Sequence, residues 1–207
     1  MVTVEVDAAG VERRLGEGQL ACPSCGGRLS RWGHARPRTV RGLEAVLRVR
    51  PRRARCSGCS VTHVLLPVSC LLRRADTVEV IGAALAARAG GAGHRTIAAR
   101  LGRAPETVRG WLRRLTGRLE TVRSFFTTLM VRVEVDPVIP EAGVSAWADA
   151  LSAICGAWTA TSSRFRGGSG VLGVGSSVGL VTLWRSACAA TSGRLLSPSW
   201  PASPVGW

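Results

Sequence analysis

Two closely spaced cysteine pairs constrain this chain of 207 residues more than any other feature of its sequence. Cys22 and Cys25 flank a Pro-Ser dipeptide, and Cys56 and Cys59 flank a Ser-Gly dipeptide. Two residues between thiolates allow a tight turn to aim both sulfur atoms at one point, so two such turns complete a tetrahedral site. The sequence therefore predicts one structural Zn²⁺ ion held by four cysteines.

Disulfides and free thiols are the alternatives to a metal site. The N-terminal residues show no basic start followed by an apolar run, so no secretory signal is visible. Disulfides are rare in the reducing compartments where such a chain is expected to reside. His63, four residues beyond Cys59, could replace one ligand, although four cysteines already suffice. Because four thiolates leave no open position for a substrate, we expect the metal to stabilise the fold only.

Positive charge is concentrated in one part of the chain. The sequence holds 28 arginines and no lysine against 13 acidic residues, for a formal net charge of +15. Residues 21–123 carry 21 of these arginines and only five acids. Such a field implies a polyanionic partner, with nucleic acid ahead of an acidic membrane surface. No uninterrupted apolar run reaches 18 residues. We therefore expect no membrane partner and a cytoplasmic, nucleoid-associated location.

Residues 94–114 have the pattern of a helix-turn-helix. Ala98 is small enough for two helices to approach closely, and Gly102 can adopt the left-handed conformation of a tight turn. Pro105 suits the first position of the second helix. The apolar residues spaced to form the core between the helices are Ile97, Leu101, Val108 and Trp111. The alternative is an ordinary helical hairpin whose arginines are merely solvated.

This stretch resembles the helix-turn-helix of repressors and transposases, whose second helix enters the major groove of DNA. Carried over by position, the resemblance implies that outward residues of the second helix face the bases: Glu106, Thr107, Arg109, Gly110 and Arg113. Arg109 and Arg113 would contact guanines, or phosphates if the helix sits higher. Contacts to the DNA backbone are implied for a second group: His94, Arg95, Arg103 and Arg114.

The segment between the cysteine pairs alternates apolar and basic residues, as the strands of a ribbon do. Five of its arginines are expected to hold phosphate or an adjacent groove: Arg48, Arg50, Arg52, Arg53 and Arg55. The order CPxCGG, basic hairpin, RxRCxxC and helix-turn-helix is similar to the N-terminal DNA-binding module of bacterial insertion-sequence transposases. It also resembles an actinobacterial family of zinc-ribbon, helix-turn-helix proteins associated with mobile elements. The resemblance covers roughly residues 20–130.

These patterns predict an α+β fold in four parts. Residues 1–20 form a strand and helix extension, and residues 21–70 form a Cys₄ zinc ribbon of β-hairpins. Residues 76–130 form a mainly α-helical helix-turn-helix domain with an extended recognition helix. Residues 137–207 form a helical segment that contains Gly, Ser and Pro.

A regular apolar stripe runs from the recognition helix onward. Its members, at alternating spacings of four and three, are Val108, Leu112, Leu115, Leu119, Val122, Phe126 and Leu129. In an unbroken helix, residues 108–129 could pair with a second copy of the chain. We favour the alternative, in which the stripe packs on the helix that contains Trp147 and Trp158. Gly110 and Gly117 also weaken a long straight helix.

The acidic residues argue against an enzyme. A catalytic transposase needs carboxylates that converge on Mg²⁺, and no acid follows Asp149. We therefore expect a non-catalytic, sequence-specific binder of double-stranded DNA, of transposase-like or transcription-regulator type. The alternative is an interaction protein that docks on a recombinase or polymerase and has only nonspecific DNA affinity.

Binding of single strands or RNA usually relies on stacking aromatic side chains. In residues 21–123 the only tryptophans are Trp32 and Trp111, and Trp111 is assigned to the core. The sequence therefore makes single-strand binding the less favoured prediction.

Overall fold

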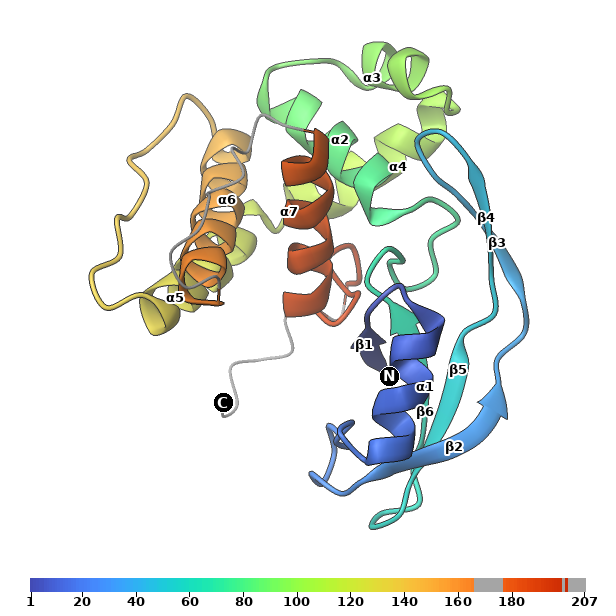
Figure 1. Ribbon diagram of the computed structural model, residues 1–207. Coiled ribbons are helices and arrows are strands. Elements are labelled where there is room, and N and C mark those ends of the chain that lie inside the picture. Colours follow the sequence, from blue (N-terminus) through green and yellow to red (C-terminus); the bar gives the residue numbers. More distant parts are fainter. Residues whose placement is uncertain (166–176, 199, 201–207) are drawn as a thin grey trace. The chain divides into compact units, whose positions relative to one another are not determined.

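The computed structural model describes residues 1–165, 177–198 and 200 (Figure 1). They form helices and a small mixed sheet, which confirms the predicted α+β fold. The described chain divides into two compact units. Unit 1 combines residues 1–78 with 188–195, and unit 2 combines residues 79–187 with the segment from Leu196 onward. Part of the predicted C-terminal segment, residues 166–176, 199 and 201–207, lies outside the described residues.

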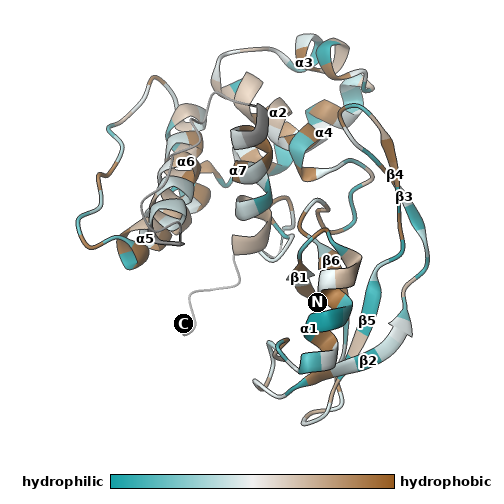
Figure 2. Ribbon diagram, viewed as in Figure 1, coloured by the Kyte–Doolittle hydropathy of each residue, from teal (hydrophilic) through white to brown (hydrophobic). Residues whose placement is uncertain are grey.

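Unit 1 is built on a four-stranded sheet in the order β1-β6-β5-β2. Its strands are β1 (Val2–Val4), β2 (Leu29–His34), β5 (Arg52–Cys56) and β6 (Thr62–Pro67). β1 pairs with β6 in parallel, and β5 pairs with both β6 and β2 in the antiparallel sense. β5, with the sequence RRARC, is largely hydrophilic (Figure 2). The sheet thus joins the two cysteine pairs through adjacent strands.

Helix α1 (Ala8–Glu17) covers one face of this sheet (Figure 1). Asp7 caps its first turn, because its carboxylate accepts hydrogen bonds from the backbone N–H groups of Ala9 and Gly10 at 3.0 and 2.8 Å. Gly18 ends the helix in the left-handed conformation. The core beneath α1 consists of Val4, Val11, Leu15, Leu20, Cys22, Leu29, Ala54, Cys56 and Leu65. Two of the four cysteines therefore belong to the hydrophobic core itself.

The insertion between β2 and β5 forms a separate antiparallel ribbon of β3 (Arg38–Arg41) and β4 (Val46–Val49). Its base is fixed to unit 1 because Val40 is buried with Leu66 and Cys70. The Arg41 guanidinium also forms an ion pair with the buried Asp76 at 2.7 Å.

Residues 188–195 complete unit 1. The backbone N–H of Leu72 donates to the carbonyl of Gly193 at 2.8 Å, and the Cys188 thiol contacts the Cys70 carbonyl at 3.4 Å. Gly193 has a φ of 72°, and a Cβ atom there would lie 3.0 Å from the Leu66 side chain. Residues 188–195 are therefore a structural part of unit 1, although most of that unit precedes residue 79.

Unit 2 is helical. Its elements are α2 (Val78–Ala89), α3 (His94–Leu101), α4 (Pro105–Thr116), α5 (Leu119–Val133), α6 (Ala146–Phe165) and α7 (Ser177–Ala190). α2 and α7 pack closely, because Gly82 lies directly against the buried indole of Trp184. Glu79 and Arg185 form an ion pair at 2.7 Å beside this contact.

The prediction of one extended recognition helix is wrong, because the structure has two separate helices there. α4 ends at Thr116 and α5 begins at Leu119, with Gly117 and Arg118 between them. α5 packs against α6 (Figure 1), and Leu119, Val122 and Phe126 are buried there. The part of the stripe on α5 thus packs within the chain, and residues 108–129 are divided between two helices. Pairing with a second copy stays a prediction.

Arg118 fastens the C-terminal segment of unit 2 to the junction of α4 and α5. Its guanidinium donates to the carbonyl oxygens of Ser197, at 2.6 Å, and Trp200. It also lies 5.7 Å from the centre of the Trp200 ring, which contacts Phe125 edge to face. Burial lowers the pKa of Arg118, because it disfavours the charged guanidinium. The two carbonyl oxygens offset part of this cost by accepting its hydrogen bonds.

No helix among the described residues is both long enough and apolar enough to cross a membrane.

We predict that Gly82→Ala destabilises unit 2 by about 1–3 kcal/mol, because the new methyl group would overlap the Trp184 indole. Gly110→Ala is the matched control, since a Cβ atom there meets only the flexible end of Arg114. The control should gain roughly 0.5–1 kcal/mol from helix propensity. Chemical denaturation followed by circular dichroism measures both effects, and equal stabilities for the two variants would contradict the prediction.

Candidate metal centre and nucleic-acid interface

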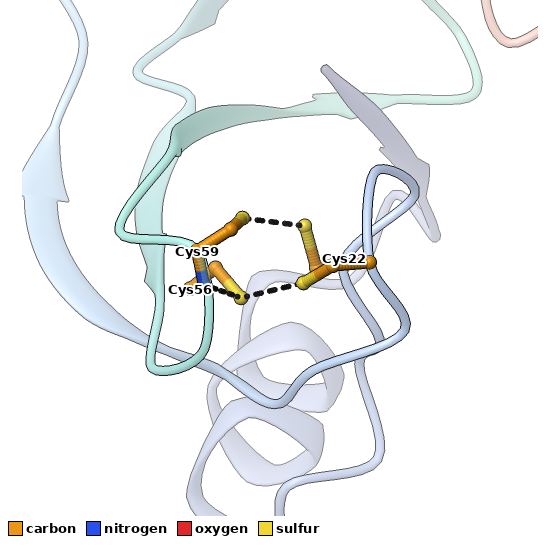
Figure 3. A group of neighbouring side chains, drawn as sticks. Cys22, Cys56 and Cys59 are labelled. Atoms are coloured by element: carbon orange, nitrogen blue, oxygen red, sulfur yellow. Dashed lines mark hydrogen bonds between the residues drawn. The ribbon is translucent and has the colours of Figure 1, made fainter.

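The four predicted cysteines converge on one point in unit 1 (Figure 3). Their sulfur atoms all lie within 4.8 Å of one another. The Cys22 and Cys59 sulfurs are 3.7 Å apart, and those of Cys25 and Cys56 are 3.4 Å apart. A tetrahedral ion with metal–sulfur bonds of about 2.3 Å places its ligands about 3.8 Å apart. The cluster therefore has the donor set and the dimensions of a metal site.

Two tight turns aim the sulfur atoms. In the first, the N–H of Gly26 donates to the Cys22 carbonyl at 2.8 Å, and Gly26 has a φ of 72°. In the second, the N–H of Ser60 donates to the Cys56 carbonyl at 3.1 Å. A Cβ atom at Gly27 would lie 3.0 Å from the Cys56 sulfur, so the turn packs against the cluster without room for a side chain.

Cys22 is held in a setting that favours its thiolate. Burial opposes ionisation, but hydrogen bonds from the backbone N–H groups of Ser24 and Cys25, and from His63 and Cys59, lower its pKa to about 5. The pKa of Cys59 moves upward: its backbone contact at Val61 favours the thiolate, but the neighbouring sulfurs and burial outweigh it. A cation among the sulfur atoms would offset this repulsion and favour the thiolate form.

His63 takes a supporting position beside the cluster. It is buried, and its Nε2 lies 3.3 Å from the Cys22 sulfur. Its Nδ1 lies 3.0 Å from the Met1 nitrogen, which is a donor, so Nδ1 accepts and Nε2 carries the proton toward Cys22. This geometry makes His63 a hydrogen-bonding partner of Cys22 beside the four-cysteine cluster.

The predicted helix-turn-helix comprises α3, the turn at Gly102 and α4 in unit 2. Gly102 has a φ of 60°, and the Arg103 N–H closes the turn on the Ala98 carbonyl at 3.0 Å. Pro105 occupies the start of α4, as predicted. Of the expected core residues, Ile97, Val108 and Trp111 are buried, and Leu101 is half-buried. The local geometry is therefore that of two helices packed across a left-handed turn.

The predicted DNA-facing residues lie mainly on the solvent side of this pair of helices. Glu106, Arg109 and Arg113 are exposed, whereas Thr107 and Gly110 are half-buried. Within the described part of the chain, neither Arg109 nor Arg113 has a hydrogen bond or an ion pair. These two cations therefore face solvent, and the only acidic residue in α3 and α4 is Glu106.

The residues predicted to contact the DNA backbone divide into two kinds. Arg95 is exposed and has no polar contact among the described residues. The same holds for Arg100, which the sequence analysis did not single out. Arg100 could have been found from its place in the last turn of the first helix. Arg103 donates to the Leu101 carbonyl at 2.9 Å, and Arg114 donates to the Gly110 carbonyl at 2.8 Å. His94 is half-buried.

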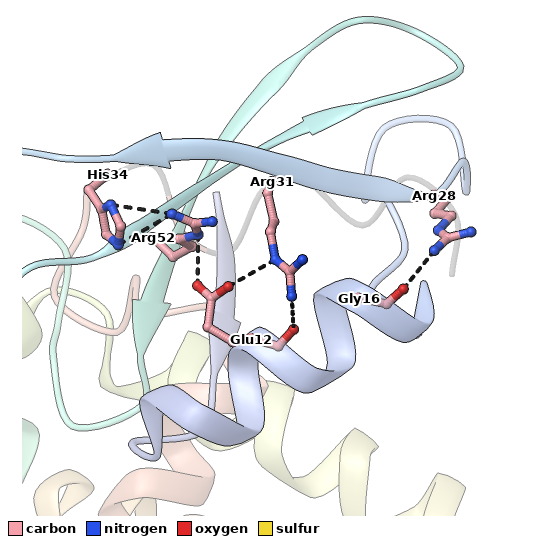
Figure 4. A network of polar contacts seen from close by, with 6 residues as sticks. All are labelled: Glu12, Gly16, Arg28, Arg31, His34 and Arg52. Carbon is pink, nitrogen blue, oxygen red and sulfur yellow. Dashed lines mark hydrogen bonds and ion pairs between the residues drawn. The ribbon is translucent and has the colours of Figure 1, made fainter.

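The arginines of β5 point to two faces of the sheet. Arg52 lies on the α1 side, 2.8 Å from the Glu12 carboxylate and 3.3 Å from His34 (Figure 4). Arg31 contacts the same carboxylate at 3.0 Å. Glu12 thus offsets part of the charge of both arginines, so Arg52 is a weaker candidate for phosphate than the sequence alone indicated.

The other ribbon arginines are open to solvent to different degrees. Arg48 and Arg50 are exposed and Arg53 is half-buried, and none has a polar contact among the described residues. Arg55 is exposed, donates to the Ser60 carbonyl at 3.3 Å and lies over the Trp32 ring at 4.8 Å. DNA contact by these side chains stays a prediction.

Comparison with known proteins finds no family model, no curated protein and no solved structure that matches this chain. The resemblance to transposase modules and to a family associated with mobile elements therefore stays a prediction that rests on the motifs.

We predict that Cys25→Ser abolishes metal retention, because it removes one of four ligands from an exposed position. Cys155→Ala, in α6 and outside the cluster, is the control and should retain the metal. Metal analysis after gel filtration both counts and identifies the ion. Full metal content in Cys25→Ser would show that the cluster is not the site.

Proposed function

We propose that this chain is a non-catalytic, sequence-specific binder of double-stranded DNA, with α4 as its reading helix. The observation that carries the proposal is the pair of exposed cations, Arg109 and Arg113, on the second helix of a helix-turn-helix. Both lack intramolecular partners in the described part of the chain. They are four residues apart, so they lie on one side of the helix.

The chemistry of Arg109 and Arg113 suits base recognition. A guanidinium can donate two parallel hydrogen bonds to the O6 and N7 atoms of guanine in the major groove. A side chain already committed to an internal carboxylate would have to break that ion pair first. Because Arg109 and Arg113 have no intramolecular ion pair among the described residues, they can bind DNA without breaking one.

Other exposed arginines supply affinity without sequence preference. Arg95 and Arg100 on α3 are exposed, and Arg48 and Arg50 are exposed on the ribbon of unit 1. Contacts from such side chains to phosphates release counterions, so binding weakens steeply as salt rises. The proposal thus assigns specificity to α4 and most of the salt-dependent affinity to other elements.

We propose zinc as the metal of the cysteine cluster. Four thiolates in tetrahedral reach favour Zn²⁺ over cations that prefer oxygen ligands. Four protein ligands leave no open position, so the ion stabilises the sheet and does not take part in a reaction. The motif resemblance adds a setting, the nucleoid, with a role in transposition or in transcriptional regulation.

The proposal predicts that Arg109→Ala relaxes base preference at one position of the DNA site, by about 1–3 kcal/mol. Arg53→Ala should weaken all sequences alike and lower the salt slope by about one. Arg123→Ala is the control, because Arg123 on α5 already pairs with Glu120 at 2.6 Å. Titrations of matched and mismatched duplexes at several salt concentrations measure these effects. Identical behaviour of the Arg109 and Arg53 variants would refute the division of roles.

A second prediction concerns the existence of a preferred site. Enrichment of a random duplex pool by the metal-loaded protein, at about 150 mM salt, should recover a motif that Arg109→Ala blurs. Recovery of DNA with no motif would overturn sequence-specific reading. That outcome would instead favour an accessory protein that docks on a recombinase or polymerase and binds DNA only through charge.

A further inference from the structure

An exposed tryptophan lies on the face of the four-stranded sheet opposite α1. Trp32 on β2 is 50% exposed, whereas Trp111 is buried in the helical core at 3%. The guanidinium of Arg55 on β5 lies over the Trp32 ring, 4.8 Å from its centre. Indole and guanidinium are both flat groups, and together they form a small stacked platform in unit 1.

The register of the sheet defines the rest of this face. Arg55 is paired with Ser30 on β2 and with Thr62 on β6, so these short polar residues flank it. Arg53 precedes Arg55 by two positions on β5, and side chains two apart on a strand share a face. The face that carries the platform therefore also holds a second cation, Arg53, and the hydroxyl groups of Ser30 and Thr62.

The two faces of the sheet differ in charge. On the α1 side, Glu12 offsets Arg31 and Arg52 (Figure 4). The face that carries Trp32 has no acidic residue on β1, β2, β5 or β6. Glu44, in the turn between β3 and β4, is the only acid between residues 21 and 75. The exposed face therefore combines an aromatic ring with uncompensated positive charge.

We propose that this face binds the unpaired bases of a single-stranded nucleic acid. Single strands are bound where bases stack on aromatic rings or on arginine planes and where nearby cations hold the phosphates. Trp32 with Arg55 supplies the first feature, and Arg53 supplies the second. Every base has a flat face, so the platform binds without sequence preference. This site lies outside the helix-turn-helix and is an activity beyond duplex recognition.

The sequence alone gives no reason to single out Trp32 as a stacking residue. Two tryptophans among 103 residues, one of them assigned to the core, are weak evidence for stacking, since most tryptophans are partly or wholly packed. Its exposure and its contact with Arg55 depend on the pairing of β2 with β5. Both residues are therefore placed by sheet register, which the sequence pattern did not fix.

The test uses the full-length, metal-loaded protein and a labelled oligo(dT) of about 12 nucleotides, a length within the span of one such surface. Fluorescence anisotropy at constant salt gives the affinity. Trp32→Ala should weaken oligo(dT) binding about 5- to 150-fold, and Trp32→Phe should retain most of it because a ring remains. Leu43→Ala is the control, since Leu43 is similarly exposed, at 55%, but lies in the turn between β3 and β4.

Salt dependence separates stacking from simple charge. Trp32→Ala should leave the salt slope unchanged, whereas Arg53→Ala should reduce it by about 0.7 for a single strand. Parallel titrations with oligo(U) distinguish the two sources of the ligand. Tighter binding of oligo(dT) identifies single-stranded DNA, and tighter binding of oligo(U) identifies RNA, in each case with the loss in Trp32→Ala.

The proposal is overturned if Trp32→Ala binds oligo(dT) as the parent does, or if Trp32→Phe is as weak as Trp32→Ala. Metal content and circular dichroism equal to those of the parent show that the variants are folded. Failure here is separable from failure of the duplex proposal. Trp32→Ala leaves duplex specificity intact, and Arg109→Ala leaves oligo(dT) binding intact, if each site acts as described.

Discussion

The convergence of four sulfur atoms within 4.8 Å is the constraint on which unit 1 depends. Its core is small, and two of the residues in that core are Cys22 and Cys56 themselves. Small units bury too little apolar surface to be secure without cross-links or metals. Four thiolates in one place repel one another unless a cation is present, so folding and metal binding should be a single equilibrium. β5, which ends at Cys56, pairs directly with both β2 and β6 and so links the cluster to the middle of the sheet.

The arrangement of charge follows from that sheet. Alternation along β5 sends Arg52 toward Glu12 and sends Arg53 and Arg55 to the opposite face. In unit 2, the helical period likewise places Arg109 and Arg113 outward, while Val108 and Trp111 face the core. In both units the buried half of each element determines which cations remain available to a polyanion. The net charge of +15 is therefore less informative than its division among faces.

The sequence predicted those features that depend on local pattern. The cysteine spacing located the cluster that could hold a metal, and Gly102 with Pro105 located the turn between α3 and α4. Gly117 was recognised as weakening a long helix, but the break itself could not be located, because the apolar stripe continues in phase across two separate helices. The partners of Arg52 and Trp32 could not be predicted, since they depend on long-range pairing of β5 with β2 and on the placement of α1.

The composition of unit 1 has a consequence for how the chain is made. Residues 188–195 belong to this unit, and the hydrogen bond from Leu72 to Gly193 joins its two parts. Synthesis proceeds from the N-terminus, so the two cysteine pairs leave the ribosome well before residues 188–195. All of residues 79–187 must emerge before unit 1 can be completed. Unit 1 therefore cannot reach its complete structure until residues 188–195 have been synthesised.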